Sequence, residues 1–239
     1  ENDIARICEH AHRVGARVIV DGVSFAPHTI PDVSSLGADV YLFSLYKTYS
    51  VHQGLMVVRR ELMDMLPNQA HFFNDSSRDK RLNPAGPDHA QVASAGAVLD
   101  YVQALHTHHG GDTDTSLREI CAAVSDRWRA HEDTLTPRLL DAVATNGSLR
   151  LLGPATLDAT PGPRCPTVAF SPTSIDPAEL ARRLVERGVH TSASDYYAWR
   201  VLDGLGLDPE RGVVRLSFVH YTAPADIDRA IEALHDVAR

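Results

Sequence analysis

Two short polar segments carry the residue types in this chain that could do chemistry. Asp21 directly follows the apolar run at 18–20, and Ser44 and Lys47 follow a second apolar run at 40–43. Both segments begin where a predicted strand ends, which is the edge at which open α/β sheets bind their ligands. An ammonium beside a buried strand is costly unless it is paired or covalently modified, and a lysine placed there can attack an aldehyde. The spacing therefore suggests an amine, a carboxylate and a hydroxyl at one sheet edge.

These three groups are what pyridoxal phosphate requires. That cofactor needs a lysine for its Schiff base, a carboxylate beside its pyridine nitrogen, and hydroxyl or backbone donors for its phosphate. A surface lysine in a turn and an aspartate that caps a helix would give the same pattern. On composition and spacing alone, this plainer interpretation is favoured.

The elements that must position these residues can be predicted from hydrophobic periodicity. Residues 3–14 have helical spacing and end at a glycine, and strands are predicted over 17–21 and 39–44. The first strand is apolar on both faces, which is typical of an interior strand of a helix-covered parallel sheet. A third apolar run, 54–58, follows after a gap too short for a helical crossover, so we expect it to be antiparallel to the second strand.

The rest of the chain alternates helices and strands after a long loop at 67–88 that is rich in proline, asparagine and glycine. We expect an α/β protein with a sheet-rich first domain at 1–110 and a smaller α+β domain at 111–239. The later elements are predicted, in order, as helices over 89–107 and 115–145, strands over 149–153 and 166–170, a helix over 177–187, a strand over 213–219 and a helix over 224–238.

Composition narrows the class of partner. The chain has 239 residues, 44% of them apolar and 23% charged, and 23 basic against 31 acidic side chains give a net charge of −8. No basic run indicates a nucleic-acid partner, and no apolar run is long enough for a membrane span. Three cysteines without a CxxC pair, together with the lack of a signal segment, predict a cytoplasmic protein. The histidines occur without an HExxH or a cysteine cluster, so no metal site is predicted.

Two separated motifs resemble the class V aminotransferase and cysteine desulfurase family of fold-type-I pyridoxal-phosphate enzymes. The first resembles the family pattern of a strand, Asp-Gly, Ala-Pro-His, a strand, Ser-x-x-Lys and Gly; the second resembles its Gly-x-x-Arg-x-Ser segment. The matching residues are Asp21-Gly22, Ala26-Pro27-His28, Ser44-Leu45-Tyr46-Lys47, Gly54 and the run from Gly212 to Tyr221. The resemblance covers nearly the whole chain. It implies the mostly parallel sheet of the large domain, incomplete at its N-terminal side, followed by a small α+β domain.

The resemblance also implies roles for individual residues. Lys47 would form the Schiff base and move the proton at the substrate Cα. Asp21 would pair with the pyridinium nitrogen, and Ser44 would hydrogen-bond the phosphate. Ser24 stands where many relatives have a glutamine near the phenolic oxygen of the cofactor. Arg215 would bind the substrate α-carboxylate through two parallel hydrogen bonds.

The chain departs from the family pattern at three places. Tyr46 replaces a histidine and could donate to the phosphate. Residues 85–89 replace a Gly-Thr-Pro segment whose threonine reaches the phosphate of the partner subunit. Residues 189–197 lack the cysteine that receives sulfur in cysteine desulfurases, which disfavours persulfide chemistry. Three aromatic residues in or beside this segment either line a substrate pocket or pack beneath a loop: Tyr196, Tyr197 and Trp199.

We therefore expect a pyridoxal-phosphate enzyme acting at the α-amine of an amino acid through Lys47, with transamination as the first choice. A desulfurase-like or other C–S lyase that works by β-elimination without a persulfide cysteine is the alternative, and an inactive fragment or cofactor-less paralogue is a third possibility. The resemblance implies a homodimer. It also implies that further sequence precedes this segment in relatives. A separate N-terminal segment that completes the fold is one explanation for this difference, and loss of that part by proteolysis is another.

Overall fold

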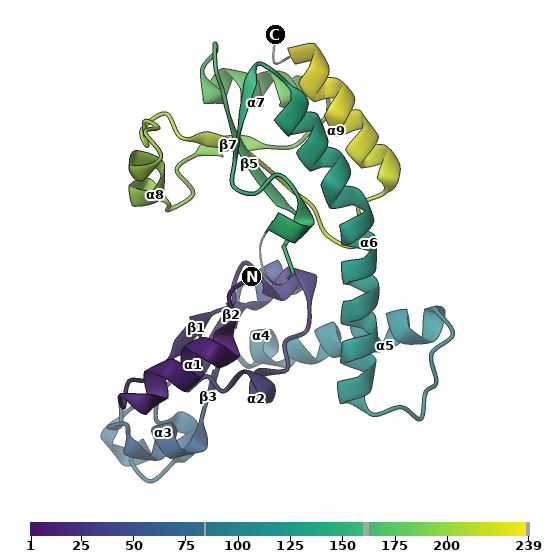
Figure 1. The fold of residues 1–239 in the computed structure, drawn as a ribbon. Coiled ribbons are helices and arrows are strands. Elements are labelled where there is room, and N and C mark those ends of the chain that lie inside the picture. Colours follow the sequence, from purple (N-terminus) through teal and green to yellow (C-terminus); the bar gives the residue numbers. More distant parts are fainter. Residues whose placement is uncertain (84, 160–162, 238–239) are drawn as a thin grey trace. The chain divides into compact units, whose positions relative to one another are not determined.

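The computed structural model describes residues 1–83, 85–159 and 163–237, which form two compact units (Figure 1). One unit is Asn2–Arg127, and the other is Trp128–Arg239 together with Glu1. The division lies within the long helix α6, Leu117–Thr145. None of the helices formed by the described residues combines the length and the apolar character needed to cross a bilayer.

The first unit contains a three-stranded sheet in the order β1-β2-β3. Strands β1 and β2 are parallel, with Asp21 opposite Leu42, and β2 and β3 are antiparallel, with Ser44 opposite Gly54. The predicted antiparallel third strand is therefore confirmed. The elements of this unit before α6 are α1 (Ile4–Arg13), β1 (Ile19–Asp21), η1 (Ala26–His28), α2 (Val33–Leu36), β2 (Val40–Ser44), η2 (Leu45–Lys47), β3 (Gly54–Val58), α3 (Arg60–Met65), η3 (Phe72–Asn74), η4 (Arg78–Lys80), α4 (His89–Ala93) and α5 (Ala95–His108).

Strand β1 differs from the buried interior strand that its composition predicts. It lies at an edge of the described sheet, next to β2 alone, and Ile19 is 67% exposed. The apolar run is nevertheless a strand because its β-branched residues favour extended backbone and its backbone pairs with β2. The expectation that both faces of β1 are covered is wrong within the described residues.

The predicted helix over 89–107 is two helices that meet at Ser94. Helix α4 is capped at its N-terminus by Asp88, whose carboxylate accepts hydrogen bonds from the amides of Ala90 and Gln91 at 2.9 and 3.2 Å. The Ser94 hydroxyl donates to the Gln91 carbonyl at 2.6 Å and lies 3.1 Å from the Ser50 hydroxyl. A serine that bonds to its own helix in this way competes with the helical ladder, which explains the break.

The second unit has a four-stranded antiparallel sheet in the order β4-β5-β7-β6. Its core takes one side chain that is at most 1% exposed from each of five elements: Leu139, Phe170, Leu180, Val214 and Leu234. Burial of each such side chain contributes roughly 1.5–3 kcal/mol to the stability of the folded unit. Two of the short elements, β6 and α8, are absent from the sequence prediction. The elements are β4 (Leu149–Leu152), η5 (Leu157–Ala159), β5 (Thr167–Pro172), α7 (Pro177–Glu186), β6 (Ser192–Ser194), α8 (Trp199–Gly204), β7 (Val213–Ser217) and α9 (Pro224–Val237).

Candidate cofactor and carboxylate sites

The parallel pairing of β1 with β2 brings the carboxyl ends of both strands to one edge of the sheet. Asp21 is the last residue of β1, and Ser44 is the last residue of β2. The amide of Gly22 donates to the Leu42 carbonyl at 2.8 Å, which extends the pairing one residue past Asp21. Lys47 follows Ser44 within η2. The carboxylate, the hydroxyl and the turn that carries the amine therefore follow strand ends at a shared edge, as the sequence predicts.

Lys47 and Tyr46 are both exposed. The Lys47 Nζ lies 6.0 Å from the centroid of the Tyr46 ring, and that ring stacks on His52 with centroids 4.8 Å apart. Among the described residues, the ammonium has no hydrogen bond or ion pair. The expectation of a desolvated lysine is wrong for this part of the chain, because the η2 turn carries the side chain beyond the strand. The amine is instead accessible to a ligand.

The loop after Lys47 is held by contacts that the sequence does not reveal. Buried Thr48 donates from its hydroxyl to the Ser44 carbonyl at 3.0 Å and from its amide to the Leu45 carbonyl at 2.8 Å. Tyr49 has a left-handed backbone with φ of 66°, and its hydroxyl donates to the Pro27 carbonyl. Such a conformation costs about 1–3 kcal/mol at a residue other than glycine. The Tyr49 bond ties the lysine loop to the 3-10 turn at 26–28.

Asp21 ends β1 and Ser24 lies in the turn that follows it, and both are exposed. The Asp21 Oδ1 accepts a hydrogen bond from the Val23 amide at 3.0 Å, which orients the carboxylate. Its other oxygen accepts no hydrogen bond from the described residues and is free to meet a ligand. A cavity of about 520 Å³ lies beside this edge; its walls include Val23, Ser44 and Gly54, but not Asp21 or Lys47.

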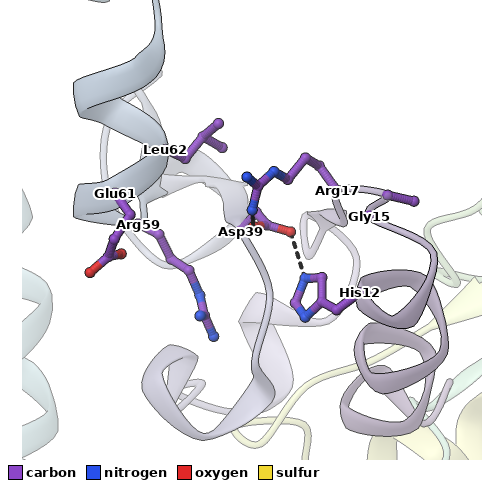
Figure 2. Close-up of a pocket in the computed structure, with 8 residues that line it drawn as sticks. His12, Gly15, Arg17, Asp39, Arg59, Glu61 and Leu62 are labelled. Atoms are coloured by element: carbon purple, nitrogen blue, oxygen red, sulfur yellow. Dashed lines mark hydrogen bonds and ion pairs between the residues drawn. The ribbon is translucent and has the colours of Figure 1, made fainter.

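A second cavity, of about 300 Å³, lies at the opposite end of the same strands (Figure 2). Figure 2 shows His12 and Arg17 directed at Asp39, which is 2% exposed. The His12 Nε2 lies 2.8 Å from one carboxylate oxygen, and the Arg17 Nη1 donates to the other at 3.0 Å. Burial alone would raise the pKa of Asp39, but the hydrogen bonds from the Val18 amide, His12 and Arg17 lower it to about 2. This cluster joins α1 and β1 to the start of β2, so we interpret it as structural.

Arg215 lies in the second unit, near the middle of β7, opposite Ala169 of β5 and Ser192 of β6. The side chain is exposed, and its Cζ lies 3.9 Å from the centroid of the Tyr196 ring. No carboxylate of a described residue forms an ion pair with it, so the simple surface ion pair that a strand arginine often makes is absent from the described part of the chain. The contact between Tyr196 and Arg215 was not predicted from the sequence. The only feature of the sequence that pointed to it is the Tyr-Tyr pair at 196–197.

The loop that carries Tyr196 is strained and closely packed against β7. Tyr196 and Tyr197 have φ of 50° and 61°, in the left-handed region that costs about 1–3 kcal/mol per residue. Gly212 also has positive φ, and a Cβ at that position would lie 2.4 Å from the backbone carbon of Ser194. Of the three aromatic residues here, Tyr196 contacts Arg215, Tyr197 is fully exposed, and Trp199 is 51% exposed. Because its side chain is fully exposed, Tyr197 does not pack beneath a loop, which was one of the two alternatives for these aromatic residues.

No group of three histidine, cysteine or acidic side chains that could hold a metal ion occurs among the described residues. All three cysteines are free, and burial raises the pKa of each thiol. For Cys165 the pKa is raised to about 11.

Solved structures identify the class of fold. A cysteine desulfurase from Thermococcus onnurineus matches 98% of this chain with a TM-score of 0.77 and 18% identity, and this chain covers 56% of that protein. The cysteine desulfurase CsdA from Escherichia coli matches 98% of this chain with a TM-score of 0.74 and 22% identity, and 55% of that protein is covered. The fold is that of the fold-type-I pyridoxal-phosphate enzymes.

Sequence comparison identifies the family. The family model "Aminotransferase class-V" matches residues 1–124, and the chain belongs to that family. An aminotransferase-like protein of Gibberella zeae is 30% identical over 99% of this chain and 55% of its own length. A probable cysteine desulfurase of Pseudomonas putida is 29% identical over 94% of this chain and 52% of its own length. The chain thus spans about half the length of these curated relatives.

Pyridoxal phosphate is the cofactor of this family, and the donor set at the β1–β2 edge fits it. The edge offers an exposed amine, a strand-end hydroxyl and a carboxylate whose second oxygen accepts no hydrogen bond from the described residues. These are the kinds of group that the aldehyde, the phosphate and the pyridine nitrogen of the cofactor require. The edge is also the one at which α/β sheets bind ligands.

Proposed function

We propose that this protein is a pyridoxal-phosphate-dependent enzyme that acts at the α-amine of an amino acid, with transamination as its reaction. The observation that carries this proposal is that Asp21 ends one of two paired parallel strands and Lys47 lies three residues past the end of the other. Membership of the class V aminotransferase family supports it.

Each residue of the strand edge has a proposed role. When bound, pyridoxal phosphate supplies a protonated pyridine ring that accepts electron density from the substrate Cα. Lys47 holds the cofactor through Nζ and moves the proton at the substrate Cα. Asp21 keeps the pyridine nitrogen protonated, because its carboxylate stabilises the positive charge there. Ser44 and Tyr46 donate hydrogen bonds to the phosphate, and Ser24 offers a short hydroxyl donor beside the ring.

Arg215 has the complementary role toward the substrate. Its guanidinium is exposed and free of ion pairs with described residues, so its N–H groups are available. Arginine binds a carboxylate through two parallel hydrogen bonds, which fixes both position and orientation. We therefore assign Arg215 to the α-carboxylate of the amino acid.

A C–S lyase that works by β-elimination is the second candidate, because several relatives are named as cysteine desulfurases. Any such reaction would release sulfur without a protein persulfide. Residues 189–197 contain no cysteine, Cys8 is buried, and a thiol with a pKa of about 11, as at Cys165, is a poor nucleophile near neutral pH.

We further propose that additional protein closes the cofactor site. Asp21, Ser24 and Lys47 are all exposed in the described chain, whereas cofactor chemistry requires a site protected from water. A second copy in a homodimer or a separate N-terminal segment would provide that cover. The free cysteines agree with a reducing, cytoplasmic location.

The sequence makes the decisive experiment simple, because it contains two lysines, Lys47 and Lys80. The protein is incubated with pyridoxal phosphate, its visible absorption is recorded, and the adduct is reduced with borohydride and mapped by mass spectrometry. We expect the band and a modified Lys47 peptide in the wild type and in Lys80→Ala, and neither in Lys47→Ala. An adduct on Lys80, or no adduct at all, would contradict the proposal.

Added amino acids then distinguish the reactions. A keto acid together with the pyridoxamine form of the cofactor indicates transamination, and pyruvate together with sulfide from cysteine indicates elimination. A protein that forms the Lys47 adduct but converts no amino acid would be a cofactor-binding paralogue rather than an enzyme.

A further inference from the structure

The contact between Tyr196 and Arg215 has a geometry suited to holding the arginine in place. The Arg215 Cζ lies 3.9 Å from the centroid of the tyrosine ring, well inside the roughly 6 Å range of cation–π attraction. A guanidinium that stacks on a ring uses its π face and keeps its in-plane N–H groups available for hydrogen bonds. The contact therefore restrains the group without consuming its donors.

That restraint matters because an arginine side chain is long and has many rotamers. Ordering such a side chain costs up to about 2 kcal/mol of conformational entropy, which ligand binding would otherwise have to offset. A carboxylate requires two parallel N–H donors in one plane, so a guanidinium already fixed in its plane binds with a smaller entropic loss.

Tyr196 is itself held by the strand that pairs with the arginine. Its hydroxyl donates to the Ser192 carbonyl at 2.5 Å, and its amide donates to the Ser194 hydroxyl at 3.2 Å. Ser192 stands opposite Arg215 in the β6–β7 ladder, so both partners are attached to adjacent strands. The Thr191 hydroxyl adds a bond to the Arg215 carbonyl at 2.8 Å.

The backbone supports the same conclusion. Tyr196 adopts φ of 50°, a conformation that residues with side chains rarely take, and strain of this kind persists where surrounding contacts impose it. Here the hydroxyl, the amide and the ring of Tyr196 all make contacts while the residue holds that conformation.

We propose that Tyr196 is a positioning residue that orients the Arg215 guanidinium for bidentate binding of a carboxylate. This inference rests on the proposed role of Arg215 as the carboxylate site, and it adds a residue that acts through that arginine. The ring face carries the function, and the hydroxyl holds the ring in place.

The test uses acetate as a carboxylate probe and the protein loaded with pyridoxal phosphate. The dissociation constant is measured from the line broadening of the acetate methyl signal in NMR titrations. The Arg215 Nε–H signal, identified by its loss in Arg215→Lys, reports the ring-current shift from Tyr196. The variants are Tyr196→Leu, Tyr196→Phe and Tyr197→Leu. The last is a matched control, because Tyr197 is adjacent, also has a positive φ and is fully exposed.

We expect Tyr196→Leu to weaken acetate binding by about three- to tenfold, the factor that corresponds to one cation–π contact, and to abolish the ring-current shift. Tyr196→Phe keeps the ring and should stay within about twofold of the wild type, as should Tyr197→Leu. Equal affinities in Tyr196→Leu and Tyr197→Leu would overturn the positioning role while leaving Arg215 as the carboxylate site. Undiminished binding in Arg215→Lys would instead reject Arg215 as the carboxylate site, and the inference with it.

Discussion

Replacement of Asp39 by asparagine tests whether the buried cluster of Figure 2 stabilises the sheet that carries Lys47. The carboxylate accepts three hydrogen bonds of 2.8–3.0 Å, from the Val18 amide, His12 and Arg17. An asparagine has one acceptor oxygen, and its NH2 group would face donors. The pKa of Asp39 is lowered from its ordinary 3.8 to about 2, which corresponds to about 2 kcal/mol of stabilisation of the charged form. We expect Asp39→Asn to lower the free energy of unfolding of residues 2–127 by about 2 kcal/mol at pH 7.

The pH dependence has a definite sign. Because the pKa of Asp39 is lower in the folded than in the unfolded chain, its contribution is complete above about pH 4 and is lost as the pH falls toward 2. The difference between the wild type and Asp39→Asn should therefore shrink between pH 7 and pH 3 and become small near pH 2.

The assay must report on the correct unit. Both tryptophans, Trp128 and Trp199, lie in the other unit, so their fluorescence is not a direct report on the strands around Asp39. Pulse hydrogen exchange of a peptide over 38–44, after equilibration in urea, does follow it, because the amides of Asp39 and Val40 bond to the Val18 carbonyl at 3.0 and 3.2 Å.

Asp64→Asn is the control for this measurement. Asp64 is 46% exposed at its side chain and pairs with Arg78, so its loss should cost about 0–1 kcal/mol. An Asp39→Asn protein as stable as this control at pH 7, or an undiminished difference at pH 3, would refute the reasoning.

Two further predictions concern the second unit. Gly212→Ala places a Cβ 2.4 Å from the Ser194 backbone, so we expect the free energy of unfolding to fall by at least about 2 kcal/mol in urea unfolding followed by tryptophan fluorescence. Gly206 also has a positive φ but lies in open space, so Gly206→Ala should lower the free energy of unfolding by only about 1 kcal/mol. Equal losses in the two variants would contradict the close approach at Gly212. Alkylation of Cys165 by iodoacetamide should be slow at pH 8 and accelerate as the pH rises toward about 11, because only the thiolate reacts and burial raises the pKa of this thiol. Alkylation at pH 8 that is as fast as in the urea-unfolded protein would contradict this prediction.

The sequence alone was enough to predict the strands that frame the proposed cofactor site. Strands β1 and β2 follow from short apolar runs, and the antiparallel direction of β3 follows from a gap too short for a crossover. Because a parallel pair ends at one edge, Asp21 and Lys47 could be assigned to that edge before any coordinate was known. These features depend on local pattern and chain length, which a sequence contains directly.

Tertiary structure decided what surrounds those residues. Tyr49 bonds to a carbonyl 22 positions earlier, and the Tyr196 ring contacts an arginine 19 positions later, in each case from a left-handed backbone that tyrosine does not favour. The short polar strand β6 exists because β7 pairs with it, and its own residues carry little apolar signal. Contacts of this kind depend on strand register and loop closure, which join residues distant in sequence. The family resemblance could therefore point to Arg215, but only the fold could place Tyr196 against it.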